Sequence, residues 1–347
     1  MINFCTLFDS NYLTRGLAMY DSLLKNSSSF HLYVLAFDDH SLHWLSETTR
    51  PHLTAISLKE FEDEKLLKVK SERTNAEYCW TCTPSIILYC LKKLDLPSCT
   101  YVDADMIFYE DPLVLINEAG ASSIIISEHR YTREYDVSLT HGIYCVQFMY
   151  FKSNEEGLGA LNWWREKCLE WCFAYLDHGR FGDQKYLDDW TTRFRGVHVM
   201  QHPGGGIAPW NIQQYEFAFT ENKIKLRRKN QSSWESLIFF HFHGLKFYSD
   251  QKVSYTGTMY EIDPTVNELI YRPYVNSLEN IQDKLCQEGI RFIPNGARKP
   301  APSKLNIFAQ FLKERILLVM KGKISIFDFS KFDFRKYYHF YTIHQPK

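Results

Sequence analysis

The chain has 347 residues, 45% of them hydrophobic, and a formal net charge of −1. This length and apolar content exclude a disordered chain and allow one large α/β domain with an appendage, or two domains. The charge is unevenly placed, because residues 298–347 carry eleven Lys/Arg and three acids, a net +8 that leaves −9 for residues 1–297. Such an acidic first part would be repelled by nucleic acid, so we expect no nucleic-acid partner.

Nine cysteines form an odd set, and the N-terminal residues show neither a basic stretch nor a long apolar run. This pattern is typical of a reduced cytosolic protein. Cys79 and Cys82, like Cys168 and Cys172, fall at helix-like spacing in apolar segments, so we expect buried thiols there rather than a zinc site. There is no stretch of about twenty apolar residues, and no transmembrane helix is predicted.

The first half of the chain alternates β-type apolar runs with helical periodicity. Such alternation predicts a mixed, mostly parallel sheet flanked by helices, and we assign it to residues 1–260. The predicted strands are residues 4–8, 30–37, 54–58, 100–102, 106–108, 122–127, 141–152 and 197–200. The predicted helices are residues 12–24, 40–50, 85–94 and 158–176, with Pro84 in the first turn of the third.

Two carboxylates, Asp103 and Asp105, interrupt a β-type run, where a buried strand ends. Strand ends are where α/β sheets place ligands. Residues two apart on extended backbone share a side, so both carboxylates can reach one hard divalent cation. The alternative is a turn with solvated or capping acids.

A second apolar run, residues 237–246, contains His241 and His243. If this run is a strand, both imidazoles lie on the same side of it. A single histidine in such a strand is usually a core residue, but two on one side, followed by Gly244 and Lys246, favour a binding site.

The order of three motifs resembles nucleotide-sugar glycosyltransferases of the GT-A (Rossmann-like) fold, family 8 in particular, over about residues 1–250. The motifs are Asp103-Ala104-Asp105, Gly182-Asp183-Gln184 and His241-Phe242-His243-Gly244. The resemblance implies that Asp103, Asp105 and His241, with His243 as second choice, hold Mn²⁺ or Mg²⁺. Manganese is slightly favoured by the nitrogen ligand.

The same resemblance assigns roles around the donor. Asp183, Gln184 and Lys246 become candidate catalytic residues, the first two under the donor sugar and the lysine on the leaving diphosphate. The candidate nucleotide- and donor-binding residues are Phe8, Asp9, Tyr12, Arg15, Arg73, Asp103, Ala104, Trp210 and Asn211. An N-cap role for Asp9 with Tyr12 in the core is the alternative for the first loop.

The sequence also departs from the family pattern. Where the related enzymes often have Asn-x-Gly, this chain has Cys145 and Gln147, and Lys246 comes one residue early. The sugar contact of the Asn is therefore open, although Gln147 can still donate and accept hydrogen bonds.

Residues 261–347 are predicted to form a helical extension rich in basic and aromatic residues. Leu305, Phe308, Leu312, Ile316 and Val319 share one helical face, with lysines around it. Residues 304–341 have the composition of a segment that lies on an anionic membrane surface, and a helix packed on the catalytic domain is the alternative.

Together these observations predict a metal-dependent glycosyltransferase of the hexosyltransferase type. It would move a sugar from a nucleotide-diphosphate donor, a UDP-sugar for preference, to a glycan or lipid-linked acceptor in surface polysaccharide synthesis. Similarity to family 8 implies a retaining outcome, in the cytoplasm or on the inner face of the cell membrane. The alternatives are a metal-dependent nucleotide-sugar pyrophosphorylase or hydrolase, and a non-catalytic sugar-binding protein of the same fold.

Overall fold

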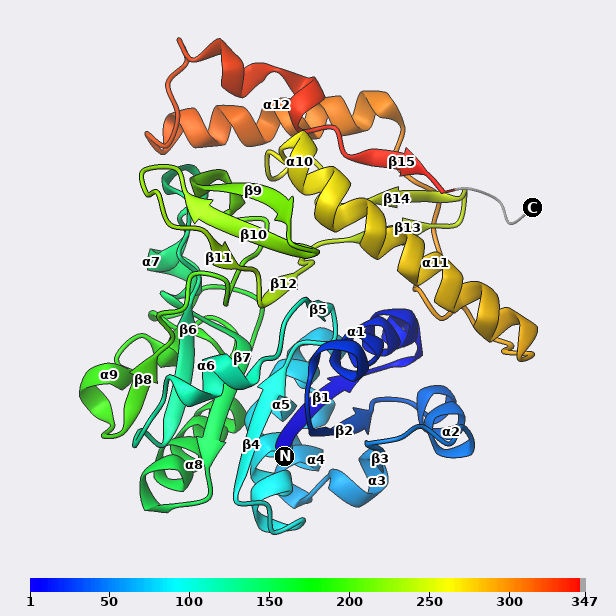
Figure 1. Cartoon of the computed structure of the whole chain (residues 1–347), viewed down its shortest axis with the longest axis vertical. Coiled ribbons are helices and arrows are strands. Elements are labelled where there is room, and N and C mark those ends of the chain that lie inside the picture. Colours follow the sequence, from blue (N-terminus) through cyan, green and yellow to red (C-terminus); the bar gives the residue numbers. More distant parts are fainter. Residues whose placement is uncertain (344–347) are drawn as a thin grey trace.

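The computed structural model describes residues 1–343 and is organised around a seven-stranded sheet (Figure 1). Its strand order is β3-β2-β1-β4-β7-β6-β8. Neighbouring strands are parallel except where β7 pairs with β4 and β6. The strands are β1 (Ile2–Phe8), β2 (Phe30–Ala36), β3 (Leu53–Ser57), β4 (Ser98–Val102), β6 (Ile124–Glu128), β7 (Tyr144–Lys152) and β8 (Val197–Val199). A mixed, mostly parallel sheet flanked by helices is the predicted fold class, which is confirmed.

Helices cover both faces of this sheet, as the side chains of β1 show. Phe4 and Phe8 enter the core with α1 (Leu13–Asn26) and α11 (Arg272–Gln287). Cys5 and Leu7 point the other way, into the core with α5 (Asn75–Lys92) and α8 (Glu155–Glu170). Every residue of β1 is buried, including Asn3 and Thr6, because both faces of the strand are covered; this is why β1 shows no apolar–polar alternation in the sequence.

The remaining α-helices that precede α10 are short. They are α2 (Asp39–Glu47), α3 (Leu58–Phe61), α4 (Glu64–Lys70), α6 (Leu113–Asn117), α7 (Ser138–His141) and α9 (Trp190–Arg193). Asp38 caps α2 by accepting from the Ser41 N–H at 2.8 Å, and it also accepts from the Ser10 hydroxyl at 2.6 Å. This carboxylate therefore fixes the loop after β2 against the loop after β1.

Helix α5 begins earlier than the sequence predicted. Thr74 and Glu77 form a capping box, each side chain bonding the other's backbone N–H, so the polar stretch before Pro84 is already helical. Pro84 lies inside the helix and not in its first turn, which corrects the prediction. The predicted helix 158–176 likewise begins at Glu155, where Asn154 caps it, and ends at Glu170.

Three small antiparallel sheets lie beside the main one. They are β9 (Tyr215–Thr220) with β10 (Lys223–Arg228) and β11 (Glu235–Ser236); β5 (Met106–Phe108) with β12 (Phe239–His241); and β13 (Lys246–Tyr248) with β14 (Lys252–Ser254) and β15 (Phe340–Thr342). The β9–β10 hairpin, not predicted from the sequence, turns through Glu221 and Asn222, whose φ angles of 55° and 60° suit a two-residue turn.

The C-terminal helical region is present as predicted. It contains α10 (Pro264–Val266), a π-helical turn at Asn267–Tyr271, α11 and α12 (Lys304–Met320). Strand β15 then returns to pair with β14, so the end of the described chain is part of a sheet. No helix within residues 1–343 is long and apolar enough to cross a membrane.

Candidate active site

Two chain segments far apart in sequence bring the carboxylate pair and the histidine together. Strand β12 pairs with β5 so that His241 lies opposite Met106, and the Phe242 N–H donates to the Asp105 carbonyl at 2.9 Å. The His241 Nε2 atom lies 3.1 Å from Asp105 Oδ1 and 3.7 Å from Asp103 Oδ2. One ligand atom from each of the three side chains lies within 4.8 Å of the others. Adjacent ligands of an octahedral ion at about 2.1 Å lie about 3 Å apart, so these donors fit one divalent ion.

The charges of this cluster do not balance. Burial alone would lower the pKa of His241, but Asp105 and Asp103 outweigh burial and raise it well above the ordinary value. The pKa of Asp105, which burial would raise, is lowered to about 2 by His241. The pKa of Asp103 is raised by burial and by Asp105. Two carboxylates with one imidazole remain short of positive charge, a deficit that a bound cation would remove.

Neighbouring side chains hold the three donors in place. Gln147, on β7, accepts through Oε1 from the His241 Nδ1–H at 2.9 Å, which leaves Nε2 facing the carboxylates. The Tyr101 hydroxyl donates to Asp103 Oδ1 at 2.9 Å. A hydrogen bond to the far ring nitrogen orients a metal-binding histidine and fixes its tautomer, so the arrangement around His241 suits a ligand.

Trp210 and Asn211 lie behind the histidines. The Trp210 ring packs edge-on against His241 and His243, each at a centroid distance of 5.5 Å, and its Nε1–H donates to the His129 carbonyl at 2.8 Å. Asn211 is fully buried: its amide donates to the carbonyls of His129 and Gly206, and its oxygen accepts from the Ala208 N–H. These bonds make the 206–211 loop rigid, and the proposed sugar contacts of both residues stay predictions.

Asp183 lies close enough to Asp103 for the two charges to interact. Burial, followed by the charge of Asp103, raises the pKa of Asp183 to about 8. Gln184 donates through its amide to the His141 carbonyl at 2.7 Å. Only a 3₁₀ turn, Lys185–Leu187, follows this pair, and not a longer helix. One such turn has too small a dipole to attract an anion, so any role of Asp183 rests on its carboxyl group.

The loop after β1 reaches the same region. Asp9 accepts from the Asn11 N–H at 3.0 Å and caps the turn before α1, while Tyr12 is 40% exposed and carries the Arg15 guanidinium over its ring at 4.4 Å. Arg15 is buried and donates to the carbonyls of Leu245 and Asn295. Phe8 is buried against Gly16, where a side chain would collide with its ring. Asp9 does cap the turn; an added role in nucleotide binding stays a prediction.

Arg73 and Lys246, the two remaining candidate cations, differ in burial. The Arg73 side chain is almost fully buried, stacks on the Phe173 ring at 3.9 Å, and its Nε has no hydrogen-bond partner within residues 1–343. Lys246 is exposed on β13, and its charge contributes to lowering the pKa of His243. Ala104, which stands between the two aspartates in the sequence, is buried. Their roles toward a donor stay predictions.

His243 lies just past the end of β12, not within a strand as predicted. Its ring centroid is 5.9 Å from that of His241. The side chain is exposed to solvent, yet protein surrounds it on most sides; desolvation and the charge of His241 lower its pKa to about 4. His243 is therefore neutral at neutral pH and available as a ligand or a hydrogen-bonding group.

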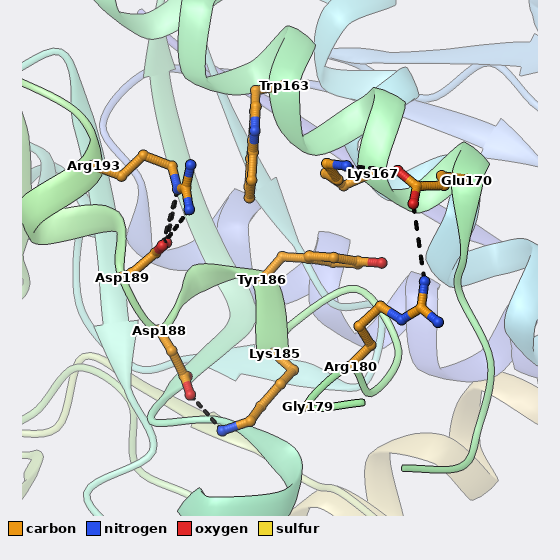
Figure 2. Close-up of a pocket in the computed structure, with 10 residues that line it drawn as sticks. All are labelled: Trp163, Lys167, Glu170, Gly179, Arg180, Lys185, Tyr186, Asp188, Asp189 and Arg193. Atoms are coloured by element: carbon orange, nitrogen blue, oxygen red, sulfur yellow. Dashed lines mark hydrogen bonds and ion pairs between the residues drawn. The ribbon is translucent and has the colours of Figure 1, made fainter. Parts of the chain in front are cut away.

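A separate hollow of about 460 Å³ lies between α8 and the 179–193 segment (Figure 2). Its charged side chains pair with one another: Lys167 with Glu170, Lys185 with Asp188, and Arg193 with Asp189 (Figure 2). Paired charges have little left to offer a diphosphate, so this hollow is a weaker candidate than the Asp103–Asp105–His241 cluster.

Two supporting residues were not assigned these roles from the sequence. Gln147 was noted only as a sugar contact, and Tyr101 only as part of a strand. Tyr101 precedes Asp103 by two positions, so strand alternation predicts that the two side chains share a side. Gln147 lies on the neighbouring strand β7. Nothing in the sequence pairs Gln147 with His241. The nine cysteines are free thiols. Cys82, Cys168 and Cys172 are buried as predicted, whereas Cys79 is only partly buried, which corrects the prediction for that residue.

The fold and the cluster define a protein with an acidic, histidine-containing site at the end of a buried strand, suited to a divalent ion. No protein-family model matches the chain. Two Bacillus subtilis (strain 168) proteins, the uncharacterized proteins YfnD and YfnF, are each 29% identical to it. The alignments cover 82% and 80% of this chain, and 90% and 93% of those proteins.

Among solved structures, the chain is similar to the galactosyltransferase LgtC in complex with donor and acceptor sugar analogs, with 11% identity and a TM-score of 0.49 over 80% of this chain and 96% of that one. It is also similar to the glycosyltransferase GlyE of Streptococcus pneumoniae TIGR4, with 11% identity and a TM-score of 0.46 over 90% and 72%. Likeness at this level assigns no activity, so the function has to be inferred from the residues of this chain.

Proposed function

We propose that the protein is a metal-dependent glycosyltransferase of the GT-A type, which moves a sugar from a nucleotide-diphosphate donor to a glycan or lipid-linked acceptor. The observation that carries this proposal is the convergence of Asp103, Asp105 and His241 from separate strands, with their ligand atoms within 4.8 Å. An O,O,N donor set suits Mn²⁺ or Mg²⁺, and a cluster short of positive charge would gain from either ion.

In this proposal, Asp103, Asp105 and neutral His241 hold the ion, and Gln147 keeps the imidazole in position. The ion, when bound, stabilises negative charge on the leaving diphosphate. Because His241 is protonated in the free protein, it must lose its proton before it can act as a ligand. Lys246 would add positive charge near the diphosphate from its exposed place on β13.

The donor would lie across the loop after β1. Tyr12 offers an aromatic face to the base, Asp9 a carboxylate to ribose hydroxyls, and Phe8 supports the loop from the core. Arg15 and Arg73 would bring positive charge to the phosphates, although Arg15 is already bonded to two backbone carbonyls. Trp210 and Asn211 would shape the wall of the sugar pocket behind His241.

Asp183 and Gln184 would lie beneath the donor sugar. With a pKa of about 8, the Asp183 carboxyl group is protonated at neutral pH in the free protein and can donate a hydrogen bond to a sugar hydroxyl. We propose a UDP-hexose as donor and retention of the anomeric configuration, with the catalytic domain in residues 1–260 and an extension in residues 261–347. The site would work in surface polysaccharide synthesis on the cytoplasmic side of the cell membrane.

Incubating the protein with a panel of nucleotide sugars and MnCl₂ tests this function. Release of nucleoside diphosphate in the presence of acceptor supports transfer, and NMR of the product gives its anomeric configuration. Release of monophosphate would point instead to a nucleotide-sugar hydrolase, and formation of nucleoside triphosphate when pyrophosphate is added would point to a pyrophosphorylase. No product with any donor, together with retained sugar binding, would point to a non-catalytic protein. Asp105→Asn is the control, since it should remove any metal-dependent product.

A further inference from the structure

Helix α12 presents its apolar residues on two sides, and only one side is covered. Ile307, Phe311 and Arg315, spaced four apart, are buried against the rest of the chain. Leu305, Leu312, Ile316 and Met320, spaced seven, four and four apart, lie on another side and have exposed fractions of 76%, 38%, 56% and 77%. An uncovered apolar stripe therefore runs along a helix of about 25 Å, at about 1.5 Å per residue.

The segment that follows the helix also exposes large apolar side chains. Ile326, Phe327 and Phe329 in the following segment are 60%, 82% and 80% exposed. Single exposed apolar side chains are normal on protein surfaces, but a continuous group of large ones usually marks an interaction site. Helix α12 and this segment form the outermost layer at one end of the molecule, across α10 and β9 from the main sheet (Figure 1).

The same layer carries positive charge that the protein does not neutralise. Within residues 1–343, Lys304, Lys313 and Lys321 form no ion pair, and Glu314 is the only acid on α12. Glu314 is engaged by Thr258 and Gln310. Residues 298–347 carry +8 on a chain whose other residues carry −9. The layer thus combines exposed apolar side chains with unpaired lysines.

This layer is fixed to the catalytic domain. Arg315 is 1% exposed and pairs with Glu134 at 3.0 Å, and Lys331 pairs with the same carboxylate at 2.7 Å. Strand β15 also pairs with β14. These contacts hold the helix on the side of Ile307, Phe311 and Arg315. The apolar stripe on the other side therefore faces outward.

We propose that the α12 layer, meaning α12 with residues 321–329, docks on the surface of an anionic lipid bilayer. Large apolar side chains can enter the headgroup region while lysines beside them pair with lipid phosphates and acidic headgroups. A second copy of the chain fits less well, because two such layers face to face would bring their unpaired lysines together. This inference stands on surface residues alone and does not depend on the proposed transferase activity.

Cosedimentation of the full chain with vesicles tests the proposal. One set contains phosphatidylcholine alone, and the other contains phosphatidylcholine with 30% phosphatidylglycerol. We expect at least tenfold stronger binding to the anionic vesicles, weakened by added salt. The triple variant Leu305→Ser/Ile316→Ser/Met320→Ser and the charge variant Lys313→Glu/Lys321→Glu should each lose at least tenfold in binding.

The matched controls carry the same kinds of change elsewhere on the surface. Leu67→Ser/Phe219→Ser replaces exposed apolar residues, and Lys68→Glu/Lys92→Glu replaces exposed lysines, so both should bind as the wild type does. Thermal melting checks that every variant is folded, and Phe327→Ser/Phe329→Ser in the loop provides a second apolar test.

Three results would overturn the proposal. The first is absent binding, or equal binding to the two vesicle types. The second is a loss of binding in the control variants as large as that in the α12 variants. The third is a dimer in solution that the triple variant dissociates, with no binding to vesicles. Release of nucleoside diphosphate, measured without vesicles, should be unchanged in the α12 variants. Failure of membrane docking is therefore distinguishable from failure of the proposed activity.

Discussion

Two clusters of buried or half-buried charge in this protein are built in opposite ways. Around Glu134, the chain supplies Arg315 and Lys331, so the carboxylate has two cationic partners. Around Asp103 and Asp105, it supplies one imidazole, with another carboxyl group, Asp183, near enough for its pKa to rise to about 8. The first cluster is complete as it stands and joins the C-terminal layer to the domain. The second is short of positive charge.

The contrast indicates where a ligand belongs. A buried charge whose partners come from the chain itself serves the fold, whereas buried like charges left together destabilise the free protein unless something else binds there. Groups with strongly perturbed pKa values are concentrated at functional sites, so such an arrangement of buried charges indicates a binding or catalytic site. The variants below test whether the two clusters differ in this way.

The largest effect is expected from changes in the proposed metal ligands. Asp105→Asn and His241→Ala should each reduce release of nucleoside diphosphate by at least about a hundredfold, because several kcal/mol of charge stabilisation depends on the ion. Folding, followed by circular dichroism and thermal melting, should be retained. Asp21→Asn, an exposed carboxylate on α1, is the control. Normal turnover in both ligand variants would show that the metal assignment is wrong.

Changes in the Glu134 cluster should lower the stability of the fold. Glu134→Gln leaves Arg315 buried without a full counter-charge, which should lower the free energy of unfolding by about 3–5 kcal/mol. Urea denaturation measures this loss, and Mn²⁺ should not restore it. Glu134→Gln/Arg315→Met should recover most of the stability, since Met replaces the buried charge with an apolar chain. A single variant as stable as the wild type would contradict the structural role of this cluster.

A smaller effect, on metal affinity, is expected from Gln147, which supports the proposed ligand His241. Gln147→Leu removes the acceptor of the His241 Nδ1–H and should weaken Mn²⁺ binding by about 10- to 100-fold, the usual cost of losing such support. Electron paramagnetic resonance of free Mn²⁺ measures the affinity. Gln147→Glu keeps an acceptor and should retain most of it. Unchanged affinity in Gln147→Leu would mean that the bond does not hold the imidazole for a metal.

The pH dependence of stability should report Asp183. Its folded pKa of about 8 lies above the ordinary value of 3.8, so its contribution to stability is full below pH 3.8 and is lost as the pH rises through about 8. One proton limits the slope to about 1.4 kcal/mol per pH unit. Urea midpoints between pH 5 and 9, without metal, should fall less steeply in Asp183→Asn. Equal slopes would show that Asp183 is ionised throughout.

The sequence predicted the parts of the site that local patterns determine. The end of a strand and the two-residue spacing are local, so Asp103 and Asp105 could be placed. The apolar run around His241 and His243 predicted that both imidazoles share a side, and the family resemblance alone chose His241 as the ligand. The bond between Gln147 and His241 could not be predicted, because it needs β7 to lie antiparallel beside β4 while β12 pairs with β5. Helical spacing identified the stripe through Leu305 and Ile316, but spacing does not tell which side of α12 the rest of the chain covers.

The most direct test of the central claim is a Mn²⁺ titration of the wild type and of His241→Ala, followed by electron paramagnetic resonance, with and without uridine diphosphate. We predict one Mn²⁺ per wild-type chain, none at the same concentrations in the variant, and weaker binding as the pH falls, because His241 must lose a proton to become a ligand. Binding of one Mn²⁺ per chain with wild-type affinity in His241→Ala would contradict the account.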